Sequence, residues 1–278
     1  FLINIRVYFG GRDELNRSRI GSIDIDLQSL PSVNYCKDEI CLDLGELGTF
    51  DDNGVMPCSV VKAEDNQTFM YYVGWNPRST TRYSFFSGLA IKTKNSEFER
   101  FSRAPLLERT DIEPFVNASP MVIRDNNIYR MYYVSGEGWI NKDRPKYNIK
   151  YAESIDGKSW KREGIVCVDF MLPGEHALAR PWVIKDDKTY RMWFGYKGSN
   201  YDLDYNYRIG YAESKDGVTF YRNDELSGID VSSSGWDSEM VTYPCVFKVQ
   251  DQLWMLYNGN EYGKHGFGIA IGEYLRND

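Results

Sequence analysis

A segment built around one proline recurs along the chain, and this recurrence limits the possible folds more than any other feature. The shared prolines are Pro57, Pro120, Pro181 and Pro244, spaced 63, 61 and 63 residues apart. Each is followed by an aromatic run such as Tyr129 to Tyr133, and then by a third run rich in Ala, Ile and Tyr. Short runs of this composition, broken by Gly, Pro and Asp-Gly pairs, favour antiparallel strands over helices.

Each copy of the segment predicts four antiparallel strands, which is one blade of a β-propeller. A partial copy precedes the four complete ones, because Asn4 begins a run like the second strand and Ser18 a run like the third. We expect the missing first strand upstream of Phe1. Counting this copy, we predict an all-β, five-bladed β-propeller with four-stranded blades around a central channel. Residues 1–278 form this single domain, with its first blade incomplete.

Charge and composition exclude several classes of partner. The formal net charge is −7 and the sequence pI is about 5.1, so nucleic acid and anionic membranes are poor partners. No apolar run is long enough to span a bilayer. An odd set of five cysteines without a CxxC pair favours reduced thiols in a cytoplasmic protein over a disulfide framework or a zinc site; they are Cys36, Cys41, Cys58, Cys167 and Cys245. We predict no cofactor and no metal.

Site candidates can be found by counting residues from the shared proline, since equivalent positions in successive blades surround the channel. Five residues before it stand Asp52, Phe115, His176 and Glu239, and one residue before it stand Met56, Ser119, Arg180 and Tyr243. We expect Asp52, His176 and Glu239 to face one another at the channel mouth. Alternative interpretations stay open: Asp51 and Asp52 as a turn, Glu239 as a solvated loop carboxylate, His176 as a structural histidine, and Arg180 in an internal ion pair.

Aromatic and polar residues at the same rim complete the candidates. A sugar ring stacks on aromatic faces while hydroxyls bond polar groups, although a long hairpin is an equally simple explanation for the residues near Asn258. The predicted catalytic residues are Asp52, Glu239 and Glu175. The predicted substrate-binding residues are Asp51, Trp75, Asn76, Ser119, Trp139, His176, Arg180, Trp236, Asp237, Tyr243 and Asn258.

The proline-anchored first strands, the Tyr-Arg-Met second strands and the Tyr-Ala-Glu-Ser third strands resemble the five-bladed propeller glycosidases. These are glycoside hydrolase families 32, 43, 62 and 68 and the mannoside phosphorylases of family 130. The chain looks closest to family-32/43-like proteins of bacterial surface-polysaccharide gene clusters. The resemblance implies that Asp52 is nucleophile or base and that Glu239, or else Glu175, is the general acid.

One departure from these families affects the expected chemistry. Families 43 and 130 often place Asp directly before the strand proline, where this chain has Met56, Ser119, Arg180 and Tyr243. From the resemblance we predict a glycoside hydrolase that acts on a carbohydrate with an Asp/Glu pair at the channel mouth, and the departure leaves other activities open. The alternatives are a glycosyltransferase or phosphorylase that takes a sugar phosphate in surface-polysaccharide metabolism, and a glycan-binding propeller without catalysis.

Overall fold

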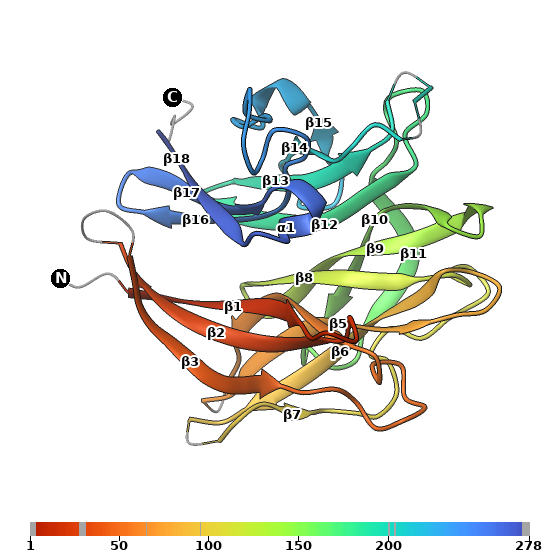
Figure 1. The fold of residues 1–278 in the computed structure, drawn as a ribbon, viewed down its shortest axis with the longest axis vertical. Coiled ribbons are helices and arrows are strands. Elements are labelled where there is room, and N and C mark those ends of the chain that lie inside the picture. Colours follow the sequence, from red (N-terminus) through yellow and green to blue (C-terminus); the bar gives the residue numbers. More distant parts are fainter. Residues whose placement is uncertain are drawn as a thin grey trace. The chain divides into compact units, whose positions relative to one another are not determined.

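The computed structural model describes residues 4–27, 32–64, 66–94, 96–199, 201–202 and 204–273, without the side chains of residues 32–38. The chain divides into two compact units. Unit 1 is Phe1–Arg109 with Val116–Ala118, and unit 2 is Thr110–Phe115 with Ser119–Asp278. Figure 1 colours both along the sequence, from red at the N-terminus to blue at the C-terminus.

Unit 1 contains two antiparallel sheets. The first has the order β1(Asn4–Arg12), β2(Ser18–Asp26), β3(Ser32–Leu42). The second has the order β4(Val55–Lys62), β5(Thr68–Pro77), β6(Tyr83–Lys92), with the short β7(Glu99–Arg100) paired to β6. Ile20, Val55, Met70 and Tyr72 pack together in its apolar core. The start of β8 also belongs to this unit, where Asn117 bridges to Phe86.

Unit 2 repeats the same strand arrangement. Its strands are β8(Asn117–Asp125), β9(Ile128–Asn141), β10(Arg144–Ser154), β11(Lys161–Val168), β12(Ala177–Asp186), β13(Thr189–Lys197), β14(Arg208–Ser214), β15(Tyr221–Arg222), β16(Thr242–Val249), β17(Gln252–Asn258) and β18(Phe267–Glu273). Hydrogen bonds join β8 through β11, β12 through β15 and β16 through β18 into successive sheets, with one parallel bridge between Tyr147 and Ala177. The only helical turns in the described part are η1(Asp224–Leu226) and α1(Asn260–Gly263).

The Asp-Gly pairs form turns, as the sequence predicts. Gly217 has a φ of +75°, a conformation that glycine adopts without strain. The carboxylate of Asp216 accepts hydrogen bonds from the backbone N–H groups of Thr219 and Val218, each 2.8 Å long. These bonds lower the pKa of Asp216 to about 2. The turn that leads from the third strand to the fourth therefore satisfies its own backbone donors.

The all-β prediction is confirmed, and the strand order inside each repeat is the predicted one. The number of five blades and the closure of a ring stay predictions. The expected strand upstream of Phe1 and the side chain of Cys36 lie outside the described residues. No helix in the described ranges has the length and apolar character needed to cross a membrane.

Candidate functional site

Four buried carboxylates recur at intervals of 62 residues, and each lies a few residues before the first strand of one sheet. They are Asp51 in unit 1 and Glu113, Glu175 and Asp237 in unit 2. In unit 1, Asp51 accepts a hydrogen bond of 2.9 Å from the Tyr72 hydroxyl and one of 2.8 Å from Arg100 Nε. The tyrosine comes from the second strand of the sheet and the arginine from the fourth. We call this arrangement the acid clamp.

Unit 2 carries the full acid clamp around Glu113 and parts of it around Glu175 and Asp237. Glu113 accepts hydrogen bonds of 2.6 Å from both the Tyr133 hydroxyl and Arg162 Nη1. Asp237 accepts one of 2.9 Å from the Tyr257 hydroxyl, and burial together with this carboxylate raises the pKa of Tyr257 to about 12. Such bonds to a charged acceptor contribute about 1.5–3 kcal/mol each, so the clamps fix the loop that enters each first strand.

Glu175 is the most heavily engaged of these carboxylates. Its two oxygens accept bonds of 2.6 and 2.8 Å from Arg222, and the Met171 N–H donates another of 2.7 Å. Arg222 also bonds Asp224 and lies over the ring of Phe194, which occupies the tyrosine position. Burial lowers the pKa of Arg222, and the bonds to Asp224 and Glu175 more than offset this, so the pKa is raised.

The acid clamp accounts for three of the predicted site residues by a structural role. Asp51, Glu175 and Asp237 are buried, and their carboxylate oxygens accept hydrogen bonds from other residues of the protein. A fixed offset from the proline did not reveal the series, because the acid lies six residues before Pro57 and Pro181 but seven before Pro120 and Pro244. The signal that would have found it is the 62-residue recurrence of the acid itself, which in three of the four sheets goes with an arginine on the fourth strand.

Backbone strain is concentrated directly before three of the shared prolines. Ser119, Arg180 and Tyr243 have φ values of 52°, 51° and 56°. Residues with side chains rarely adopt this left-handed conformation, and a following proline favours extended backbone instead. The strand pairing shifts register at Arg180 and Tyr243, which marks a bulge. Strain of about 1–3 kcal/mol per residue persists at sites that need a side chain aimed in one direction.

Two of these strained residues, Arg180 and Tyr243, belong to a cluster of aromatic side chains in unit 2. The Arg180 guanidinium lies 5.1 Å from the ring centre of Tyr243, and the Tyr243 ring stacks on Tyr262 at 6.2 Å. Tyr262 in turn meets the edge of the buried Tyr207, whose hydroxyl lies 2.6 Å from that of Tyr147. These residues lie near the start of a first or third strand, or follow a second strand, so they gather at one end of unit 2.

This tyrosine cluster was missed at the sequence level except for Tyr243. Tyr147 lies in the first part of β10 and Tyr207 directly before β14, 60 residues apart, so aligning the repeats on their third strands would have shown them. Tyr262 carries no comparable signal, because its position depends on the strained turn of α1, where its φ is 61°. Asn258 holds that turn, since its Nδ2 donates 2.9 Å to the Tyr262 carbonyl. The predicted residue Asn258 thus positions Tyr262.

Glu239 lies beside this cluster with its backbone fixed and its side chain exposed. Asn260 Oδ1 accepts the N–H groups of Glu239 and Met240 at 2.8 and 3.1 Å, and Arg208 Nη1 donates 2.9 Å to the Glu239 carbonyl. Two residues later, the Val241 N–H donates to the Tyr207 carbonyl. The Glu239 carboxylate makes no hydrogen bond or ion pair within the described part of unit 2.

His176 is buried at the same end of unit 2. Its Nδ1 lies 3.3 Å from the Gly174 carbonyl, and its backbone bonds Lys197 and Tyr147. Burial lowers the pKa of His176 below its usual value, and the nearby cations Lys197 and Arg144 lower it further. The imidazole is therefore neutral near pH 7, which suits a structural or hydrogen-bonding role better than an ionic one.

Unit 1 holds the other predicted carboxylate in a tight loop. Asp52 is half-buried, and its Oδ2 accepts 2.9 Å from the Gly48 N–H. Asn76 Nδ2 donates to the Thr49 carbonyl of the same loop, and Trp75 Nε1 donates to Ser18. The backbone N–H of Trp75 also donates to the Gly54 carbonyl, so Trp75 and Asn76 support the loop that carries Asp52. Because Asp52 belongs to unit 1 and His176 and Glu239 to unit 2, the expected meeting of these three side chains stays a prediction.

The two remaining tryptophan candidates have different surroundings. Trp236 stacks on Tyr257 with ring centres 5.3 Å apart, and its indole lies against the backbone of Gly259 and Gly268. Trp139 is half-buried on β9, opposite Pro145 of β10. Trp236 therefore packs the last hairpin. Among the described residues, no group of three or more His, Cys, Asp or Glu side chains could hold a metal ion.

No protein-family model matches the chain. The uncharacterized protein Rv1502 of Mycobacterium tuberculosis is 40% identical over 267 residues, which are 96% of this chain and 87% of that protein. This chain belongs to the Rv1502 family. An identity of this size over nearly the whole of both chains implies the same fold along their shared length.

Solved structures show which fold this is. A thermostable family-43 glycoside hydrolase superimposes with a TM-score of 0.66 at 16% identity, covering 99% of this chain and 91% of that one. The endo-arabinase from Bacteroides thetaiotaomicron gives a TM-score of 0.60 at 12% identity, covering 99% of this chain and 96% of the endo-arabinase. The predicted resemblance to the propeller glycosidase superfamily is confirmed at the level of fold.

Proposed function

We propose that this protein cleaves a glycosidic bond, with Glu239 as the general acid and Asp52 as the base or nucleophile. The observation that carries the proposal is the state of Glu239. Its backbone is held by Asn260 and Arg208 while its side chain remains exposed. Tyr243, four residues later, lies under the guanidinium of the strained Arg180. A proton donor for a leaving oxygen needs this combination of a fixed position and an accessible carboxyl group.

The buried acids support the same assignment by contrast. Glu175, the second choice for the acid, uses both oxygens on Arg222 and Met171, so it is left out of the proposed pair. Asp51 is likewise occupied by Tyr72 and Arg100, which leaves Asp52 as the carboxylate of that loop for catalysis. Arg180, Tyr243 and Tyr262 would contact the sugar, because stacked rings and guanidinium N–H groups suit its faces and hydroxyls.

The proposal is tested with a panel of methyl glycosides and 2,4-dinitrophenyl glycosides of the common hexoses and pentoses. A phenolate with two nitro groups leaves without protonation, whereas an alkoxide does not. The Glu239→Gln variant should therefore lose about 10²–10⁴-fold in kcat/KM on methyl glycosides and retain most activity on the dinitrophenyl series. Asp52→Asn should lose activity on both series.

A matched control is Glu225→Gln, which changes an exposed carboxylate on η1 of the same unit. It should leave both activities unchanged. Equal losses for Glu239→Gln on both series would refute its role as acid, and full activity of Asp52→Asn would remove it from the pair. A wild-type protein that releases sugar only in the presence of inorganic phosphate would replace hydrolysis by phosphorolysis.

A further inference from the structure

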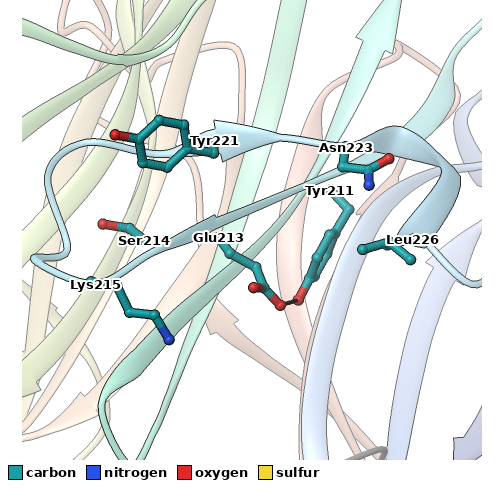
Figure 2. Close-up of a pocket in the computed structure, with 7 residues that line it drawn as sticks. All are labelled: Tyr211, Glu213, Ser214, Lys215, Tyr221, Asn223 and Leu226. Atoms are coloured by element: carbon teal, nitrogen blue, oxygen red, sulfur yellow. Dashed lines mark hydrogen bonds between the residues drawn. The ribbon is translucent and has the colours of Figure 1, made fainter. Parts of the chain in front are cut away.

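A shallow pocket of about 270 Å³ lies at β14 and β15, and none of the residues that line it is a predicted site residue. Figure 2 shows its lining side chains. They come from the end of β14, from the turn after it and from the segment between β15 and η1. The seven residues are Tyr211, Glu213, Ser214, Lys215, Tyr221, Asn223 and Leu226.

The pocket exists because the fourth strand of this sheet is short. In the preceding sheet, β11 runs for eight residues and pairs with β10 from Ile149 to Glu153. Here β15 has two residues and pairs only with Ala212 and Glu213, after which the chain turns into η1. The outer edge of β14 is therefore bordered by side chains where a full-length strand would otherwise pair with it.

The preceding sheet also provides an internal comparison for the groups at the pocket. In both sheets a tyrosine donates 2.6 Å to the glutamate two residues later, Tyr151 to Glu153 and Tyr211 to Glu213. Above the first pair, Lys161 and Glu163 form an ion pair of 2.9 Å. The equivalent places above the second pair hold Tyr221 and Asn223, two uncharged residues.

The lining groups suit an uncharged, polyhydroxylated ligand. The Tyr221 side chain is 76% exposed, so its ring offers an open face for stacking. Glu213 Oε1 accepts a hydrogen bond from Tyr211 and lies 3.9 Å from Arg191 Nη1, and the Asn223 side chain does not cap η1. Lys215, the one cation of the lining, donates to Thr189. Because both charged lining groups already have protein partners and Leu226 is the only aliphatic residue of the lining, the pocket favours neither ions nor apolar molecules.

We propose that this pocket is a second, non-catalytic site that binds one neutral sugar residue of a glycan. Tyr221 stacks on the sugar face, and Glu213 and Asn223 bond its hydroxyls. The site does not depend on Glu239 or Asp52, so it goes beyond the proposed function. Its open form predicts weak binding that gains from a second contact when one glycan occupies both sites.

Saturation-transfer NMR on the full chain tests the proposal, with maltose, cellobiose and xylobiose as neutral probes and glucuronate and glucose 6-phosphate as charged ones. At least one neutral disaccharide should bind. Tyr221→Ala should weaken its binding by about tenfold, the loss expected for one stacked ring, while Tyr221→Phe keeps it. Because Tyr221 is exposed, both variants should keep the wild-type circular dichroism spectrum.

The control is Lys161→Ala, which alters the equivalent place of the preceding sheet and should leave binding unchanged. Glu239→Gln should also keep the Tyr221-dependent binding even where it abolishes cleavage, which separates this proposal from the proposed function. The proposal is overturned if no neutral disaccharide binds, if Tyr221→Ala binds as the wild type does, or if only the charged probes bind.

Discussion

Replacing Arg222 by methionine tests whether the acid clamps are structural. The Arg222 side chain is 7% exposed and that of Glu175 is fully buried. Arg222 is bonded to both Glu175 and Asp224, so Arg222→Met would leave two carboxylates facing each other without a cation. Methionine keeps most of the apolar stem packed on Phe194, so the change removes charge more than volume.

The expected loss follows from the burial of the pair. Removing one partner of a buried ion pair costs about 3–5 kcal/mol, because the remaining charge loses its compensation. Glu175→Gln is milder, since the amide oxygen still accepts from Arg222 and Asp224 still holds the guanidinium. We expect it to cost about 1.5–3 kcal/mol, the range for hydrogen bonds to charged groups.

Urea unfolding followed by tryptophan fluorescence measures both losses against the wild type. The control is Lys161→Met, which removes an exposed ion pair with Glu163 and should not shift the midpoint measurably. At a urea concentration where each variant is still folded, Glu175→Gln should retain activity on the dinitrophenyl glycosides. A Glu175→Gln protein with unchanged stability and no activity would refute the structural role and return Glu175 to the catalytic candidates.

Two further predictions concern the end of unit 2 that carries Glu239. Burial lowers the pKa of His176, so its stabilising contribution is complete above about pH 6.5 and is lost as the pH falls below that value; His176→Gln should flatten this dependence and His265→Gln should not. Arg180→Gly should be more stable than Arg180→Ala by about 1 kcal/mol, because glycine adopts the left-handed backbone without strain. Equal urea midpoints for these two would contradict the strain.

The repeat in the sequence determined the strands, their order within each sheet and the turns between them. Proline spacing, aromatic second strands and Asp-Gly pairs are local signals, since each depends on the conformations that a few consecutive residues can adopt. For the same reason the sequence indicated where the strands begin, and so which loops could carry a site. Glu239, Arg180 and Tyr243 were chosen as site candidates in this way, from positions relative to Pro181 and Pro244.

Only the tertiary structure decided which polar side chains are buried in hydrogen bonds and ion pairs with other residues and which are exposed to solvent. Glu175 and Glu239 look alike in sequence, yet one is neutralised by Arg222 from 47 residues further along the chain and the other reaches solvent. That difference depends on long-range contacts, which pattern and spacing do not encode. Tyr262 and the pocket beside Tyr221 likewise result from a strained turn and a shortened strand, whose effects appear only when neighbouring strands pack together.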